Sequence, residues 1–397
     1  MKIDTKNFLI KIHNNIYFNT LNNKIYKKEN GIIFKNINDF LENIKFFDIF
    51  QHINITIIPT FRCTLECSHC FIKQNLVKYN EKENINLNRN NIIKYIHSYN
   101  QSYKIKSINV VFVGGEPLIN YELCNNILDE LIIFCKKNNI KLKSSVSTSL
   151  FININHDIIN FLKKNNSIMI SVDGNENSHN NQRKSNDSYI NKNPFKKTIE
   201  NLNEIIKYIS IKNISINCSL SNNFLKNKNI IDDVNYIMNF LKIKQYKIHS
   251  ICPVNKKDKE YFNNKKLFIK GFNEKKFNNK SHYRWCCGFR YMSNFIISPN
   301  GNISTNYHDI NNSIIGNLNS TINELEINYK KYILNNMPVL KDESCMNCPA
   351  LNYCWGKCFI YSKYLYKNNP SKYCDRKKII NLLKKSIKNK YIQLKIK

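Results

Sequence analysis

From residue 51 to residue 252 the chain alternates short apolar segments with longer amphipathic ones. Stretches with helical periodicity, such as YELCNNILDELIIFCKK and FKKTIENLNEIIKYI, separate the apolar segments. Strands that alternate with helices form a parallel sheet covered by helices, so the pattern predicts an α/β fold, a partial (β/α)6 TIM-like barrel. The six expected strands are 53–59, 107–113, 141–148, 167–173, 213–219 and 245–251.

The segments on either side of this barrel have other patterns. Residues 1–50 combine short alternating runs with a helix-like NDFLENIKFF, which predicts a small β-meander and a helix. This element is either a cap on the main sheet or a docking site for a peptide that adds as an extra strand. Residues 253–285 are charged and Asn-rich, which favours a bridge. Residues 286–397 contain a predicted hairpin turning at Asn300-Gly301, a cysteine-rich region and a basic amphipathic tail.

Composition narrows the class of protein. The chain has 397 residues and a formal net charge of +32, which favours an acidic partner such as a peptide or RNA. The lysines are spread among many Asn and Ile residues, however, a bias that an A/T-rich coding sequence also produces. No apolar run approaches the roughly 20 residues of a membrane-spanning helix, and the first residues lack the features of a signal peptide. We therefore expect a cytoplasmic protein without a membrane partner, in which the 14 cysteines indicate metal binding more than disulfides.

Three cysteines directly follow the first predicted strand. Cys63, Cys67 and Cys70 are spaced C-x3-C-x2-C, which is too tight for disulfide bonds among them. Three soft thiolates on one short loop suit a metal or an iron–sulfur cluster. Three ligands in place of four would leave one iron of a cluster open.

Two other strand ends carry residues suited to ligand binding, because the chemistry of such barrels gathers at the C-terminal ends of strands. The second strand ends in Gly114-Gly115-Glu116-Pro117. Its glycines would let a ligand approach the backbone and its carboxylate would attract a cation, although this sequence is also an ordinary tight turn. The fourth strand ends in Ser171-Val172-Asp173-Gly174, followed by His179 and Arg183. These groups could hold a ligand with hydroxyl and carboxylate groups, although a solvated loop has the same composition.

Together these motifs resemble the radical S-adenosylmethionine (SAM) superfamily. The resemblance rests on the three-cysteine loop followed by Phe71, on GGEP after the second strand, and on SVDG-x4-His-x3-Arg after the fourth. It implies an enzyme with a [4Fe-4S] cluster on Cys63, Cys67 and Cys70, whose open iron is chelated by SAM. It further implies that an electron donor such as flavodoxin or ferredoxin reduces this cluster. Cleavage of SAM then gives a 5′-deoxyadenosyl radical that abstracts hydrogen.

The resemblance also implies roles for individual residues. Gly114, Gly115 and Glu116, followed by Pro117, would meet the methionyl amino group of SAM. Ser171 and Arg183, with Asp173 between them, would meet its carboxylate or ribose. His69 and Phe71 would border the cofactor, and His69 stands where the family commonly has Tyr or Phe. The third strand usually ends Thr-Asn-Gly in the family, whereas this chain has Thr148-Ser149-Leu150.

A second group of cysteines lies near the C-terminus, at Cys345, Cys348, Cys354, Cys358 and Cys374. Their spacing suits structural zinc as well as iron–sulfur. In company with the barrel they resemble the SPASM extension of radical SAM enzymes, which implies one or two auxiliary [4Fe-4S] clusters. Cys345, Cys348, Cys354 and Cys374 would hold one, and Cys358 with Cys286 or Cys287 would belong to the other.

One position departs from the SPASM pattern. The family places a cysteine five residues after the hairpin glycine Gly301, and this chain has Asn306 there. The inner auxiliary cluster would then be absent, incompletely ligated, or completed by His308, Asp309 or the adjacent cysteine. Sulfatase-maturing members typically follow that cysteine with an Asp that acts as a base, where this chain has Tyr307.

We therefore expect a radical SAM peptide maturase whose partner is a precursor peptide or small protein. It would abstract hydrogen from a residue of a ribosomally made peptide to form a crosslink, an epimer or another carbon-centred change. Oxidation of a side chain in a folded client, as in sulfatase maturation, is the alternative enzyme. A basic nucleic-acid-binding protein with zinc-ribbon-like modules is the alternative from another class, but charge alone favours nucleic acid. Four single cysteines, Cys124, Cys135, Cys218 and Cys252, are expected to pack in the core.

Overall fold

The computed structural model describes residues 9–13, 16–19, 24–27, 51–70, 72, 87–186, 193–220, 246–250, 294–337, 339 and 341–351, with 371, 374, 376–377, 379–381 and 383–385 near the C-terminus. They form two compact units, of which one holds the described residues of 49–277 and 291–329 and the other those before 49 and from 330 onward. Several predictions lie outside the described residues. These concern the helix-like segment at 38–47, the bridge at 253–285, and Phe71, Cys252, Cys286, Cys287, Cys354 and Cys358.

Six parallel strands in chain order form the main sheet, as the sequence predicts. Neighbouring strands pair in the order β4, β6, β7, β8, β10 and β11. Because each strand lies beside the next one along the chain, this is the order of an open (β/α) barrel. The strands are β4 (His52–Ile57), β6 (Ser107–Phe112), β7 (Lys141–Thr148), β8 (Ser167–Ser171), β10 (Ile214–Leu220) and β11 (Tyr246–Ser250).

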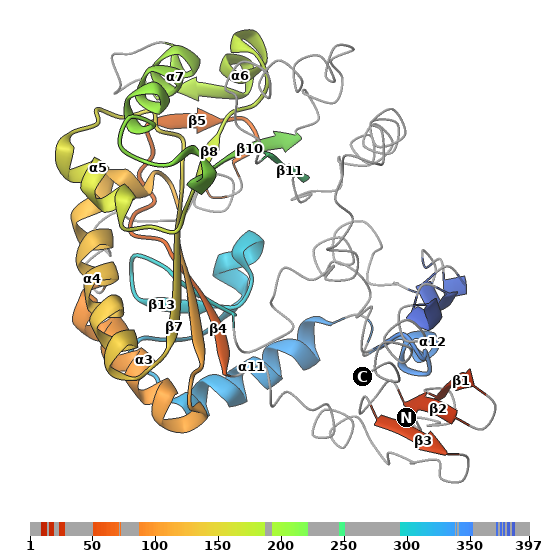
Figure 1. Ribbon diagram of the computed structural model, residues 1–397. Helices are drawn as coiled ribbons and strands as arrows, with labels where there is room; N and C mark the ends of the chain where they lie inside the picture. The colour runs from red at the N-terminus through yellow and green to blue at the C-terminus, as the bar shows by residue number, and fades with distance from the viewer. Residues whose placement is uncertain are drawn as a thin grey trace. The chain divides into compact units, whose positions relative to one another are not determined.

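Helices cover one face of this sheet, and Figure 1 shows α3, α4 and α5 along it. Four of the helices begin after an Asn whose side chain accepts a hydrogen bond from the backbone N–H three residues on: Asn88, Asn155, Asn175 and Asn193. Such an N-cap stabilises a helix by about 1 kcal/mol, so part of the high Asn content has a structural use. The helices are α3 (Arg89–Tyr103), α4 (Tyr121–Lys137), α5 (His156–Lys163), α6 (Glu176–Gln182) and α7 (Pro194–Ile205), with 3-10 turns η3 (Pro117–Asn120) and η4 (Ile211–Asn213).

The core lies between the sheet and these helices. Alternate residues of β4, which are Ile53, Ile55 and Ile57, are fully buried, as are Ile108 and Phe112 of β6. Val110 of β6 is buried as well, and the residues that alternate with these positions are only partly buried or exposed. Cys124, Cys135 and Cys218 are also buried, which confirms their predicted place in the core.

A hairpin extends the sheet beyond β4. Strand β12 (Asn294–Ile297) pairs with β4 in parallel, and β13 (Asn302–Ser304) and β14 (Ile314–Asn317) follow as antiparallel neighbours. The turn at Asn300-Gly301 is where the sequence predicts it, and Gly301 has a φ of +79°. The turn η7 (Tyr307–Asn312) joins β13 to β14, and α11 (Ile322–Asn336) comes after the hairpin. Strand β4, which precedes the three-cysteine loop, therefore has a hydrogen-bonded neighbour on each side.

The other unit contains an N-terminal sheet and a short C-terminal helix. Strands β1 (Leu9–His13), β2 (Ile16–Asn19) and β3 (Lys24–Lys27) form an antiparallel meander, as predicted. Helix α12 (Glu343–Met346) carries Cys345. In the part of the chain that the structure describes, no helix is both long and apolar enough to cross a membrane.

Candidate active site

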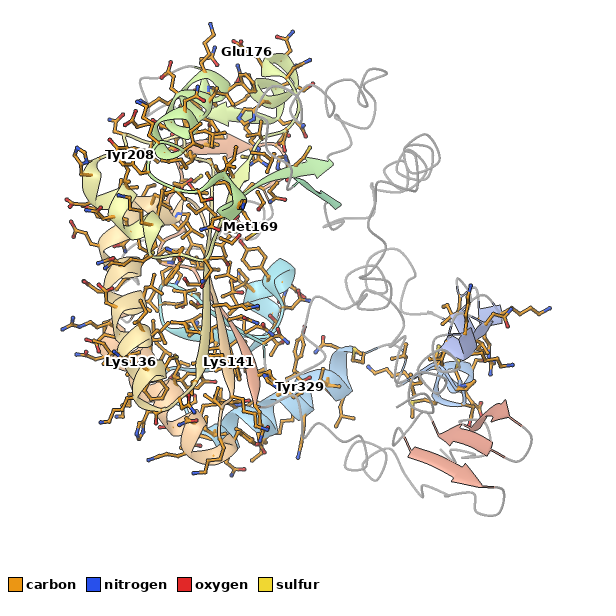
Figure 2. The ribbon with its side chains drawn as sticks, viewed as in Figure 1. Lys136, Lys141, Met169, Glu176, Tyr208 and Tyr329 are labelled. Carbon is orange, nitrogen blue, oxygen red and sulfur yellow. The ribbon has the colours of Figure 1, made fainter. Side chains whose placement is uncertain are left out.

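A two-stranded ladder holds the three-cysteine loop. Strand β5 (Leu65–Cys67), inside the loop, pairs antiparallel with β9 (Arg183–Ser185), so that Cys67 lies opposite Arg183. Two backbone hydrogen bonds extend the ladder, from Ser68 to Gln182 and from Asn186 to Thr64, both at 2.9 Å. In Figure 2, Lys141 marks the amino end of β7, and Glu176, which follows β8, lies at the opposite end of the barrel. The cysteine loop follows β4 and so belongs to the carboxyl end.

The three thiols are close enough to influence one another. None of the three cysteines is in a disulfide bond, and all three are half-buried. Burial, the carboxylate of Glu116 and the other two thiols raise the pKa of Cys63. Burial raises the pKa of Cys67 to about 11, although nearby Arg183 opposes this shift. At neutral pH Cys63 and Cys67 are therefore thiols until a cation such as iron stabilises their thiolates.

A buried carboxylate lies beside the cysteine loop. Four donors hold Glu116, which is 1% exposed. Its Oε1 accepts from the backbone N–H of Leu118 at 3.2 Å and from the Thr148 hydroxyl at 2.6 Å. Its Oε2 accepts from the backbone N–H and the hydroxyl of Ser149, at 2.8 and 2.6 Å. Burial raises the pKa of Glu116 and these hydrogen bonds oppose the rise.

The glycine pair before Glu116 lets the cysteine loop pack against this strand end. Backbone hydrogen bonds join Gly115 to Thr60 at 3.1 Å and Glu116 to Arg62 at 2.8 Å. A Cβ on Gly115 would overlap the carbonyl oxygens of Phe61 and Arg62, and one on Gly114, whose φ is +153°, would lie 2.8 Å from the carbonyl oxygen of Thr60. The glycines are thus required by the chain's own loop, whereas the sequence interpretation assigned them to a ligand.

A buried ion pair lies at the end of β8. Asp173 is fully buried, and Arg183 donates to it from Nε at 2.7 Å and from Nη2 at 3.2 Å. The Nη2 of Arg183 also donates to the Ser219 hydroxyl at 3.2 Å, and its Nη1 donates to Cys67 Sγ at 3.7 Å. The guanidinium lowers the pKa of Asp173 against the opposing effect of burial. Asp173 and Arg183, which the sequence analysis assigned to a ligand, therefore pair with each other, and Arg183 also contacts the cysteine loop.

Comparison with known proteins adds to this geometry. Residues 57–237 match the radical SAM superfamily. The chain carries a radical SAM domain. Radical SAM enzymes use SAM and a [4Fe-4S] cluster, and these are the cofactors of this enzyme.

Solved structures share the fold of this chain. A structure of native anSMEcpe, an anaerobic sulfatase-maturating enzyme, with bound AdoMet and the Kp18Cys peptide has a TM-score of 0.61 at 16% identity, and the match covers 85% of this chain and 99% of that one. A tagged form of anSMEcpe with bound AdoMet has a TM-score of 0.58 at 18% identity, covering 83% of this chain and 98% of that one. No curated protein sequence matches the chain. At these identities the likeness concerns the fold.

The loop of the radical SAM domain suits a cluster better than a single metal ion. Among the described residues, no three His, Cys, Asp or Glu side chains are grouped so as to hold one ion. A cluster spreads its cysteine ligands over separate irons, whereas zinc needs ligands that converge on one point. The three thiols influence one another but do not converge on one point, which fits a cluster.

Several buried polar atoms near this loop have no partner within the described part of the chain. They are His69 Nδ1, Thr64 Oγ1, His179 Nε2 and both side-chain polar atoms of Gln182. An unpaired buried polar group costs about 1–3 kcal/mol, so such a group indicates a missing partner. Burial, with Arg183 nearby, lowers the pKa of His69 to about 4, so its imidazole is neutral at pH 7. A neutral ring can stack on a base without placing a second positive charge beside Arg183.

The residues that hold Glu116 in the radical SAM domain come from the strand end that departs from the family pattern. Thr148 is the last residue of β7 and Ser149 follows it, and together they supply three of the four donors to Glu116. Leu150 follows with a φ of +56° and is fully buried. This left-handed conformation favours glycine, the residue that the family usually has at this position. The backbone therefore has a conformation suited to glycine although the residue is leucine.

Asn306 and Tyr307 lie in the turn after β13. Asn306 is 1% exposed, its backbone N–H donates to Ser313 Oγ at 3.1 Å, and its carbonyl oxygen accepts from the same hydroxyl at 3.2 Å. Tyr307 packs beside Phe61 against an apolar cluster of Ile58, Ile296 and Ile310. Burial and nearby Cys70 raise the pKa of its phenol. Tyr307 is therefore near the loop of the radical SAM domain.

Three of the predicted auxiliary ligands lie within the described residues, in the other unit. Asp342 accepts from the backbone N–H of Cys345 at 3.1 Å and from that of Ser371 at 3.2 Å. The backbone N–H of Cys348 donates to the Cys345 carbonyl at 3.0 Å, and that of Cys374 donates to the Ser371 carbonyl at 3.2 Å. One carboxylate thus joins the turn of Cys345 and Cys348 to that of Cys374.

Proposed function

We propose that this enzyme abstracts hydrogen from a residue of a ribosomally made peptide. The observation that carries the proposal is the shared anchoring of the cysteine loop and Glu116. The loop's carbonyl groups accept the N–H groups of Gly115 and Glu116, so ligands of the cluster and of SAM would keep a fixed distance. A fixed geometry is what places a radical precursor beside a C–H bond. Similar folds with bound AdoMet and a peptide support a peptide substrate.

In this proposal Cys63, Cys67 and Cys70 hold the cluster. Gly114, Gly115, Glu116 and Pro117 border the methionyl amino group of SAM. Two of the four donors to Glu116 are hydroxyl groups, which can rotate and leave lone pairs for an ammonium group. When bound and reduced, the cluster and SAM supply the 5′-deoxyadenosyl radical.

The end of β8 would hold the remainder of SAM. Ser171 is its last residue and is half-buried, and Asp173 and Arg183 lie beyond it. Arg183 has five N–H donors, of which four are used within the protein, so one is left for a carboxylate or hydroxyl of the ligand. His69 would stack on the adenine, and Phe71 would lie beside it.

We further propose one auxiliary cluster on Cys345, Cys348, Cys354 and Cys374. The double hydrogen bond of Asp342 supports it, because it brings two of the cysteine turns together. A second cluster would be held by Cys358 with Cys286 or Cys287. It would lack the cysteine ligand that the family has at the position of Asn306.

Oxidation of a side chain in a folded client is the second candidate. The fold shared with anSMEcpe favours it. The residue that would act as base is Tyr307, however, and a phenol is a far weaker acid than the carboxyl of the Asp in sulfatase-maturing members, so it stays protonated at neutral pH. We therefore rank modification of a peptide first.

The test is anaerobic incubation of the reconstituted, reduced protein with SAM. We expect 5′-deoxyadenosine from the wild type and none from Cys67→Ala, and mass spectrometry should show a modified peptide when a precursor peptide is added. Product formation that survives Cys67→Ala would contradict the proposal. Modification of a folded sulfatase with no effect on any peptide would favour the second candidate. Bound zinc in place of iron would favour a zinc-ribbon protein.

A further inference from the structure

Arg183 has an unusual set of partners for a residue expected to bind substrate or cofactor. Its guanidinium is 8% exposed and donates to Asp173 twice, to Ser219 once and to Cys67 Sγ once. The guanidinium cannot move away from the thiol without breaking its three other hydrogen bonds. The contact with the cysteine is thus a fixed part of the fold.

The backbone also fixes this contact. Cys67 and Arg183 are directly opposite each other in the ladder of β5 and β9. The bonds of Ser68 and Asn186 close the ladder at both ends. The side chain of Asp173 is fixed in turn, because its Oδ1 accepts from the backbone N–H of Ser219 at 2.8 Å. Neither partner of the ion pair can shift without disturbing two strands.

The ion pair is oriented with its positive end toward the cysteine loop. Arg183 lies between Asp173 and Cys67, since it donates to both of them through different nitrogens. Inside a protein such a dipole is screened less than in water. A positive group and an N–H donor beside a ligand sulfur stabilise the cluster state with the more negative charge, which is the reduced state.

We propose that Arg183, held by Asp173, is a positioning residue that raises the reduction potential of the cluster through Cys67. This inference rests on the proposed cluster at Cys63, Cys67 and Cys70. It adds a role to Arg183 beyond the contact with SAM, for which one N–H is left. The two residues have different roles. Arg183 contacts the sulfur of Cys67, whereas Asp173 does not contact it but holds the guanidinium of Arg183 in the orientation that does.

The experiment is a redox titration followed by electron paramagnetic resonance, on the full chain, of the cluster whose signal changes when SAM is added. Arg183→Gln removes the positive end and leaves Asp173, so we expect a lower midpoint potential. Asp173→Asn removes the negative end and leaves Arg183, so we expect a higher one. Each shift should change the ratio of reduced to oxidised cluster at least tenfold at a fixed potential, which is about 59 mV for one electron.

Lys184→Gln is the matched control. Lys184 lies on β9 beside Arg183 and is exposed, so the variant loses the same charge without touching the ion pair. Its potential should equal that of the wild type. A purely structural ion pair would give shifts of the same sign in Arg183→Gln and Asp173→Asn, or none, and either result overturns the proposal. If Arg183→Gln binds no iron, Asp173→Asn decides alone, and a potential at or below the wild-type value overturns it. A wild type without a SAM-responsive cluster would instead contradict the proposed function.

Discussion

The hydroxyl and the backbone N–H of Ser149 donate to the same oxygen of Glu116, at 2.6 and 2.8 Å. Two donors from one residue define the direction of the carboxylate as well as its position. They come from the end of β7, whereas Glu116 follows β6, so the bonds join adjacent strand ends. The geometry of Glu116 therefore depends on a residue outside the motif that contains it.

Removing this hydroxyl should weaken both the fold and SAM binding. We expect Ser149→Ala to lower the free energy of unfolding by about 1–3 kcal/mol, because a buried acceptor loses a donor. The dissociation constant of SAM should rise about 3- to 10-fold, the effect of roughly 1 kcal/mol. Urea unfolding and calorimetry measure the two quantities. Ser147→Ala, the same change two residues earlier on β7, should affect neither, and an equal effect of both variants would contradict the assignment.

Glu116 should make the stability of the protein depend on pH. Burial raises its pKa in the folded state, so the folded state binds this proton more tightly than the unfolded state does. This contribution to stability is complete below the ordinary pKa of a glutamate and is lost as the pH rises through the folded value. The stability of Glu116→Gln relative to the wild type should therefore increase from pH 4 to pH 7. Urea unfolding of both proteins across this range tests it, and a constant difference would argue against a raised pKa.

Leu150 should show the conflict between backbone strain and burial. Leu150→Ala loses a buried side chain at a cost of about 2–5 kcal/mol. Leu150→Gly loses slightly more, but it relieves a left-handed conformation that costs a non-glycine residue about 1–2 kcal/mol. We expect both variants to be less stable than the wild type. The free energy of unfolding of Leu150→Gly should exceed that of Leu150→Ala by about 1 kcal/mol or somewhat less. An alanine variant more stable than the glycine variant in thermal or urea unfolding would contradict the strain.

Tyr307→Phe separates the two candidate functions. If the enzyme modifies a peptide without a base at this position, production of 5′-deoxyadenosine and of modified peptide should remain within about threefold of the wild type, since general base catalysis contributes about 100-fold or more. If the phenol acted as the base, product formation should fall by about that factor while cleavage of SAM continued. Liquid chromatography of both products gives the answer.

Asp342→Ala should remove auxiliary iron without affecting the first cluster. The change deletes both hydrogen bonds that join the turn of Cys345 to that of Ser371. Iron analysis should fall by about four per chain, the content of one cluster, while the SAM-responsive signal remains. Glu343→Gln, which alters the neighbouring charge on α12, should keep its iron. Full iron content in Asp342→Ala would contradict a shared cluster at these turns.

The barrel could be predicted from sequence because its strands repeat one physical pattern. Each of the six observed strands lies within two residues of its predicted range at either end, and the largest differences are at the carboxyl ends of β4 and β8. Apolar β-branched runs such as INITI are buried on one face, and helical periodicity fills the intervals between them. The pattern of apolar and polar residues is informative here because the buried face of each strand and helix must be apolar.

The site was only partly predictable for the opposite reason. Asp173 and Arg183 could be proposed because they follow the carboxyl end of a predicted strand, where the chemistry of such barrels gathers. Strands β5 and β9 have three residues each and carry no periodicity, so the contact of Arg183 with Cys67 could not be foreseen. Ser149 was regarded as a departure from the family pattern, yet it supplies two donors to Glu116. Contacts between two loops depend on which residues lie opposite each other, and this pairing cannot be predicted from the sequence of either loop alone.

The parallel pairing of β12 with β4 bears on how the protein is synthesised. Asn54 donates to Asn294 at 2.9 Å across a separation of 240 residues. The ribosome adds roughly 5–20 residues per second, so about 12 to 50 s pass before the partner of β4 exists. During that time β4 is the edge of an unfinished sheet, with unpaired N–H and C=O groups that can join another chain. The strand that leads into the cysteine loop is thus the one that needs protection longest in a newly made molecule.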